Sequence, residues 1–178
     1  MDKAAFLAWA ERCDERYELV HGRVVMMVGG TRAHWQIALN LAKALDARID
    51  RQKWSVLPEF GVDAGPDTVR YPDIVVDPAG APAKDLTARA PVLIAEVLSP
   101  SSERTDLADK AAEYLRLPSL ATYIVVAQDE VKAWVWNCKA TGFPAGPAVT
   151  EGEAGIVDIP SLGIELPLRE IYDRVRLD

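Results

Sequence analysis

The sequence PVLIAEVL, residues 91–98, decides the fold of this chain. Only Glu96 interrupts its apolar residues, and the run Ser99-Pro100-Ser101-Ser102 ends it. Such a stretch is typical of a strand that lies inside a sheet and is covered on both faces. Because alternate residues of a strand share a face, we expect Glu96 on the same side as Ile94 and Leu98.

Helices and strands are expected after this run. The pattern predicts a helix over 105–117, which Pro118 ends, and a terminal helix over 168–176. Residues 121–127 and 131–137 are predicted to form a hairpin.

Two more helices are expected before the run, over 2–13 and 32–52, and Thr31 is the expected cap of the longer one. The upstream strands are predicted in a hairpin over 16–28 and in two β-rich stretches, 54–63 and 68–76. This order favours an α/β (α+β) fold with a central mixed β-sheet flanked by helices. With 178 residues, we expect one domain, 1–178.

The composition is that of an ordinary soluble protein, with 49% apolar and 26% charged residues. No apolar run is long enough to span a bilayer, and residues 1–15 lack the features of a signal peptide. Only Cys13 and Cys138 are present, too few for a disulfide framework. We therefore expect a cytoplasmic protein without a membrane partner.

The chain is acidic, with 20 Lys and Arg against 27 Asp and Glu and a net charge of −7. Because neutralisation of phosphates drives general nucleic-acid binding, this charge argues against tight nonspecific binding. The basic residues considered for phosphate contacts are Arg23, Arg32, Arg70, Lys84, Arg89 and Arg104, although solvated surface charge is the ordinary interpretation of each.

Two acidic residues fall where burial is expected. Asp73 lies in RYPDIVV, where strand alternation puts it on the face of Val75, and Glu96 lies in the apolar run. A buried carboxylate needs a cation or hydrogen bonds. Asp73 could instead cap a turn, and Glu96 could form a buried ion pair with an Arg or Lys.

Three further polar residues fall on neighbouring elements. Lys110 is near the inward face of the helix over 105–117, His34 begins the inward stripe of the helix over 32–52, and Glu18 lies in a β-rich stretch. The ordinary alternatives are a lysine whose stem covers apolar surface and a core histidine with satisfied hydrogen bonds.

Two acids and an amine on converging elements are compatible with bound Mg²⁺, or with Mn²⁺ in its place, because such ions prefer carboxylate oxygens. The ion polarises a phosphoryl oxygen, and a nearby lysine orients water or stabilises the developing charge. The sequence contains no GxSxG, P-loop, HExxH or CxxC pattern, which argues against the chemistries that those motifs support.

Three strings, in order, resemble a large bacterial family of putative restriction endonucleases within the PD-(D/E)XK nuclease-like superfamily. They are YELVHGRVVMM (17–27), YPDIVV (71–76) and IAEVLSPSSERTDLADKAAEYLRL (94–117), the last followed by ATYIVVA. The resemblance implies a restriction-endonuclease-like core and a Mg²⁺-dependent phosphodiesterase site. It implies that Asp73 and Glu96 bind the metal, that Lys110 positions or activates water, and that Glu18 and His34 assist at the edge.

One position departs from the superfamily pattern. Leu98 stands where a lysine is expected two residues after the second acid, and Lys110 matches the lysine of this family instead. The main hypothesis is a Mg²⁺-dependent endonuclease that acts on nucleic acid, DNA in particular, as a homodimer. Two alternatives stay open: a catalytically silent nuclease-fold protein that acts as a binding or interaction module, and a plain α/β domain with structural ion pairs.

Overall fold

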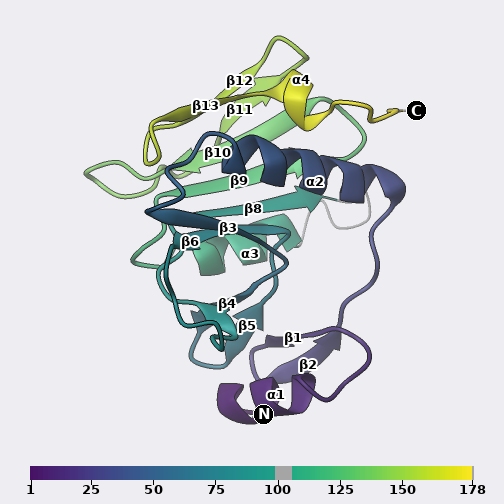
Figure 1. Cartoon of the computed structure of the whole chain (residues 1–178), viewed down its shortest axis with the longest axis vertical. Coiled ribbons are helices and arrows are strands. Elements are labelled where there is room, and N and C mark those ends of the chain that lie inside the picture. Colours follow the sequence, from purple (N-terminus) through teal and green to yellow (C-terminus); the bar gives the residue numbers. More distant parts are fainter. Residues whose placement is uncertain (99–105, 178) are drawn as a thin grey trace.

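A six-stranded mixed sheet forms the centre of the computed structural model, which describes residues 1–98 and 106–177 (Figure 1). Strands β8 and β9 are parallel, whereas the other neighbouring pairs are antiparallel. The strand order is β11 (Ala148–Glu151), β10 (Lys132–Asn137), β9 (Thr122–Ala127), β8 (Leu93–Leu98), β6 (Ile74–Pro78) and β3 (Trp54–Pro58).

Helices cover both faces of this sheet (Figure 1). Helix α2 (Arg32–Asp46) packs through Leu41 in one apolar core, to which β8 contributes Ala95. Helix α3 (Asp106–Tyr114) packs through Tyr114 in a second core, to which β8 contributes Ile94. All six residues of β8 are buried, so the prediction of a central strand covered on both faces is confirmed, as is the fold class.

A second, five-stranded sheet lies at the end of the molecule that carries the N-terminus (Figure 1). Helix α1 (Lys3–Ala10) packs on it through Phe6, which contacts Leu19 and Val69. The strand order is β2 (Arg23–Met26), β1 (Tyr17–Val20), β5 (Thr68–Arg70), β4 (Gly61–Gly65) and β7 (Thr87–Ala88). Near the other end, the hairpin of β12 (Ile156–Ile159) and β13 (Ile164–Pro167) leads into α4 (Leu168–Ile171).

Several predicted elements are shorter than expected. The stretch 54–63 divides into β3 and β4, because Glu59 adopts a left-handed conformation with φ of 50° and redirects the chain into the other sheet. The stretch 68–76 divides into β5 and β6 at Pro72, which has no N–H for a strand ladder.

The helices also end early. Helix α2 ends at Asp46 rather than at residue 52: the Arg48 N–H donates to the Leu45 carbonyl three residues back at 2.9 Å, and the Asp50 carboxylate accepts the Gln52 N–H at 3.0 Å in a further local turn. Helix α4 has only four residues, and residue 105, where the helix that became α3 was expected to begin, lies outside the described residues. Within the described part of the chain, no helix is both long and apolar enough to cross a membrane.

Candidate active site

The two predicted acids lie on neighbouring strands of the central sheet. Asp73 is the last residue of the connection from β5 and directly precedes β6, while Glu96 lies within β8. In the antiparallel register of these strands, Ile74 pairs with Ala95. The next position along this register brings Asp73 beside Glu96.

Both oxygens of the Asp73 carboxylate have hydrogen-bond partners. Its Oδ2 accepts the Val97 N–H at 2.7 Å, and its Oδ1 lies 2.9 Å from Nε2 of His34. His34 is held in the first turn of α2, where the Thr31 hydroxyl accepts its backbone N–H as a cap. The capped first turn of α2 thus places the His34 imidazole beside the Asp73 carboxylate, at the start of β6.

The pKa of His34 is set by opposing influences. Burial lowers it, but the hydrogen bond to Asp73 and the charges of Asp73 and Glu96 raise it, so that the pKa is raised overall. A protonated imidazole is therefore favoured beside the Asp73 carboxylate.

The Glu96 carboxylate receives two hydrogen bonds from α3. Lys110 Nζ donates to Glu96 Oε1 at 3.0 Å, and the Tyr114 hydroxyl donates to the same oxygen at 3.0 Å. Lys110 and Tyr114 are four residues apart, so one helical face presents both donors to the strand. Lys110, which lies on a helix instead of at the superfamily position occupied here by Leu98, therefore reaches Glu96, the second acid.

Burial and neighbouring charges both shift the pKa values of Glu96 and Lys110. Burial raises the pKa of Glu96 to about 7, the Lys110 charge opposes that rise, and the nearby Asp73 adds to it. Burial lowers the pKa of Lys110, yet the charges of Glu96 and Glu18 raise it overall. Lys110 is thus an ammonium at neutral pH, suited to stabilise negative charge and to orient water rather than to accept a proton.

Glu18 lies in a different environment, a buried network centred on Arg70. Its Oε2 accepts from Arg70 Nη1 at 3.0 Å, and its Oε1 accepts the Tyr71 N–H at 3.0 Å. The remaining donors of Arg70, Nε and Nη2, bind the Glu113 carboxylate at 2.8 and 2.9 Å. The guanidinium is buried and occupied, so the idea that Arg70 approaches phosphate is wrong.

The donor set is compatible with a hard divalent ion. Among the described residues, no group of three or more His, Cys, Asp or Glu side chains is arranged to hold a metal. Mg²⁺, however, is commonly bound by one or two carboxylates and several waters. Asp73 and Glu96 supply two carboxylates, and Glu96 Oε2 receives no hydrogen bond from the described residues. Oxygen ligands are therefore present for such an ion.

The model of a family described as "Putative restriction endonuclease" matches residues 4–168. The chain belongs to this Uma2 family. Two relatives of this Uma2 protein are uncharacterized proteins from Synechocystis sp. One is 28% identical over 130 residues, covering 70% of this chain and 73% of the relative, and the other is 29% identical over 131 residues, covering 71% and 68%.

The fold of this chain is similar to that of a solved structure. The crystal structure of a putative nuclease belonging to DUF820 from Anabaena variabilis has a TM-score of 0.77 and 16% sequence identity, and the match covers 97% of each chain. At this identity the similarity shows a shared fold.

Two contacts of the candidate active site are not predicted from the sequence. Tyr114 lies in the string over 94–117 that carries the resemblance, but its contact with Glu96, to which its hydroxyl donates, is not predicted from the sequence. Glu113, which binds Arg70, gave no signal apart from being an acidic residue one position before Tyr114.

Proposed function

We propose that this protein is a Mg²⁺-dependent endonuclease that hydrolyses phosphodiester bonds in DNA. The observation that carries the proposal is the 3.0 Å contact between Lys110 Nζ and Glu96 Oε1, directly beside Asp73. Two acids and an ammonium thus meet where two neighbouring strands of the central sheet, β6 and β8, lie under α3. Membership of a family of putative restriction endonucleases supports the same reaction class.

Each residue has a distinct part in this proposal. Asp73 and Glu96 would hold Mg²⁺, or Mn²⁺, which when bound polarises a phosphoryl oxygen and lowers the pKa of a coordinated water. Lys110 stabilises negative charge on the phosphate and orients the attacking water. His34 holds the Asp73 carboxylate in place. Glu18 is a positioning residue that acts through the Tyr71 N–H.

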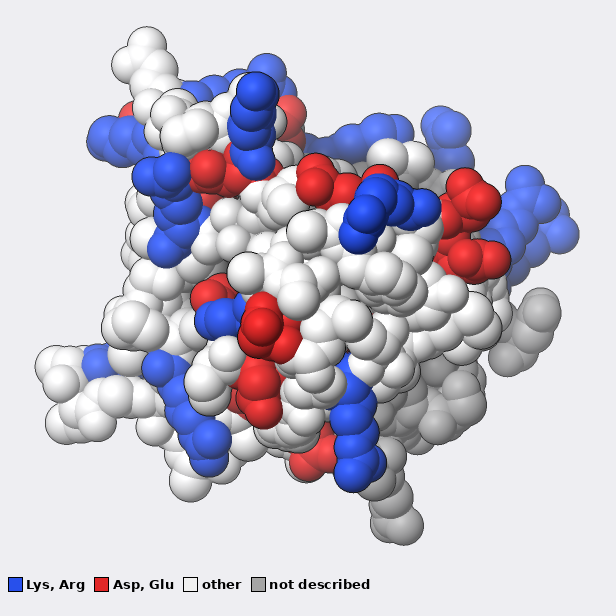
Figure 2. Space-filling view, turned by 90° about the horizontal axis from the view of Figure 1, so that it is seen from below, with Lys and Arg blue, Asp and Glu red and all other residues white. Residues whose placement is uncertain are grey.

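Surface charge sets the expected affinity for DNA. Figure 2 shows Lys and Arg side chains spaced singly over the face seen from below, with Asp and Glu between them. This mixture and the net charge of −7 favour weak binding to DNA.

The proposal also covers organisation and location. Residues 1–178 act as one domain, a view supported by the buried Arg70–Glu113 pair, which joins β5 of one sheet to the helix that covers the other. We propose a cytoplasmic protein that works as a homodimer, because cutting both strands of DNA takes two sites. Sedimentation velocity measures the oligomeric state, and a monomer at all concentrations would refute the dimer.

Cleavage of supercoiled plasmid with Mg²⁺, with Mn²⁺ and with EDTA tests the activity. We expect nicking by the wild-type protein with either metal and none in EDTA. Asp73→Asn and Glu96→Gln should not cut, whereas Glu153→Gln, at an exposed position, should cut normally. Wild-type protein that cuts neither plasmid, single-stranded DNA nor RNA would favour the silent binding protein instead.

A further inference from the structure

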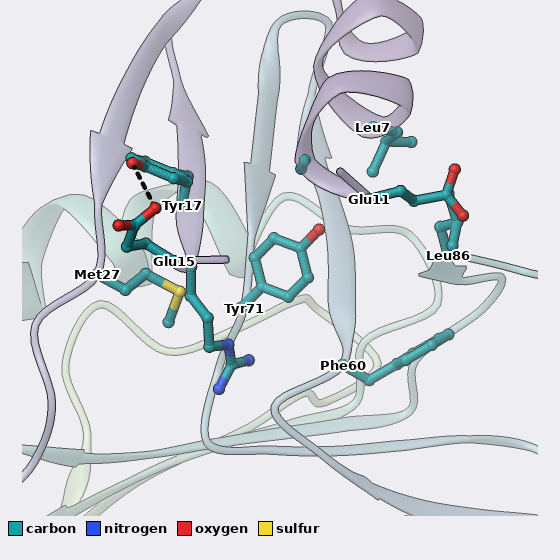
Figure 3. Close-up of a pocket in the computed structure, with 10 residues that line it drawn as sticks. Leu7, Glu11, Glu15, Tyr17, Met27, Phe60, Tyr71 and Leu86 are labelled. Carbon is teal, nitrogen blue, oxygen red and sulfur yellow. Dashed lines mark hydrogen bonds between the residues drawn. The ribbon is translucent and has the colours of Figure 1, made fainter. Parts of the chain in front are cut away.

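A pocket of about 280 Å³ lies between α1, the β1–β2 hairpin and the start of β4 (Figure 3). Figure 3 shows the Tyr71 ring between Glu15 and Tyr17 on one side and Leu7 and Glu11 on the other. Its lining combines aromatic rings with charged groups, from Tyr17, Phe60, Tyr71, Glu11, Glu15 and Arg16.

The pocket is joined to the candidate active site through the backbone. Tyr71 precedes Asp73 by two residues in the same connection between β5 and β6. On the other wall, Arg16 forms an ion pair with Glu59, whose N–H donates to the Asp73 carbonyl at 3.0 Å. A ligand in the pocket would therefore lie close to the carboxylates that act on the phosphodiester.

The residues that line the pocket favour a ligand with a flat ring and N–H donors. Aromatic faces and the Met27 side chain favour a flat ring that can stack. Glu11 and Glu15 are exposed carboxylates that accept hydrogen bonds, so they favour N–H donors on the ligand and disfavour a second phosphate. An exocyclic amino group, as on cytosine, is the donor that a glutamate recognises on a base edge.

We propose that this pocket holds one unpaired nucleobase that carries an exocyclic amino group, next to the phosphodiester bond to be cleaved. The inference rests on the proposed function and adds a substrate preference to it. Stacking on Tyr71 holds the base, and the two glutamates disfavour thymine, which has no amino group. The preferred substrate is then a single-stranded or locally unpaired site rather than an intact duplex.

Binding without metal tests the pocket separately from cleavage. Fluorescence anisotropy in EDTA compares labelled single-stranded hexamers of deoxycytidylate, of thymidylate and of abasic deoxyribose phosphate. We expect the deoxycytidylate hexamer to bind at least about fivefold more tightly than the other two, since stacking and donor contacts each add to affinity. A cytidylate RNA hexamer shows whether the sugar matters.

Variants of the lining sharpen the test. Tyr71→Ala should weaken deoxycytidylate binding at least about fivefold, while Tyr71→Phe, which retains the ring, should not. The double variant Glu11→Ala/Glu15→Ala should abolish the preference for deoxycytidylate over thymidylate, a ratio that a general change of charge does not alter. Val149→Ala removes exposed apolar surface on β11 and serves as the control.

Three results would overturn the inference: equal affinity for all three hexamers, a Tyr71→Ala protein that binds like the wild type, or no saturable binding up to about 1 mM protein. None of these depends on cleavage. If the protein cuts plasmid but shows no base preference, the proposed function stands and the base-binding pocket is refuted. If it binds deoxycytidylate preferentially but does not cut, the pocket stands and the proposed function is refuted.

Discussion

Lys110 Nζ lies 3.0 Å from Glu96 Oε1, although the helix and the strand that carry them are separated by a connection of several residues. The superfamily pattern expects the amine on the same strand as the acid, two residues further on, where this chain has Leu98. Leu98 instead packs in the apolar core under α3. The amine therefore reaches the carboxylate from the covering helix.

Replacing the relocated amine should stop cleavage. We expect Lys110→Met to lower the rate of plasmid nicking at least about hundredfold, because the ammonium beside the phosphate is lost. Lys110→Arg, which keeps a positive charge, should retain part of the activity. Lys139→Met, at an exposed position, is the matched control. A Lys110→Met protein as active as the wild type would remove Lys110 from the mechanism.

Metal binding should require both acids. We expect a calorimetric titration with Mn²⁺ to show binding to the wild type, with an affinity at least about tenfold lower in Asp73→Asn and in Glu96→Gln. Glu153→Gln should bind as the wild type does. Heat released equally by all four proteins would place the metal elsewhere, and no heat from any of them would favour structural ion pairs.

The buried network around Arg70 should matter more for folding than for chemistry. Arg70→Met leaves the Glu18 and Glu113 carboxylates buried without their cation, so we expect the free energy of unfolding to fall by about 3–5 kcal/mol in urea titrations. Glu18→Gln should keep nicking within about tenfold of the wild type, since Glu18 acts through Arg70 and Tyr71. A complete loss of nicking in a stable, folded Glu18→Gln protein would instead give Glu18 a direct catalytic part.

Tyr172 should give the unfolding free energy a dependence on high pH. Its hydroxyl donates to the Ala127 carbonyl at 2.6 Å, and burial raises its pKa to about 12. The unfolded chain releases this proton nearer pH 10, so the stabilisation is complete below about pH 10 and is lost as the pH rises towards 12. Tyr172→Phe should be about 1 kcal/mol less stable at neutral pH, with the difference shrinking above pH 10. A difference that stays constant across this range would show that the phenol does not titrate differently on folding.

The elements predicted from apolar periodicity are largely present. The runs at 91–98 and 121–127 form the two central parallel strands, because strands buried on both faces are rich in apolar residues, which the sequence shows directly. The breaks at Glu59 and Pro72 were missed, because strand composition continues across them while the backbone changes sheet.

The residue types of the candidate site could be predicted from the sequence, but the contacts between these residues could not. An acid inside an apolar strand is unusual enough that Glu96 could be singled out. Lys110 could also be named as the candidate amine, but whether it reaches Glu96 depends on how α3 packs over the sheet, a long-range property that no local pattern encodes. For the same reason Arg70 was assigned to the surface, although Glu18 and Glu113 enclose it.

The helices that serve the two acids lie on opposite faces of one sheet. His34 reaches Asp73 from α2, which packs in one apolar core, and Lys110 reaches Glu96 from α3, which packs in the other. Because each contact depends on a different core, we expect loosening of either core to displace one of the two contacts before the sheet unpairs. We therefore expect the proposed nuclease activity to be lost on heating before the strands separate. The temperature at which turnover is lost would then report on the packing of both cores.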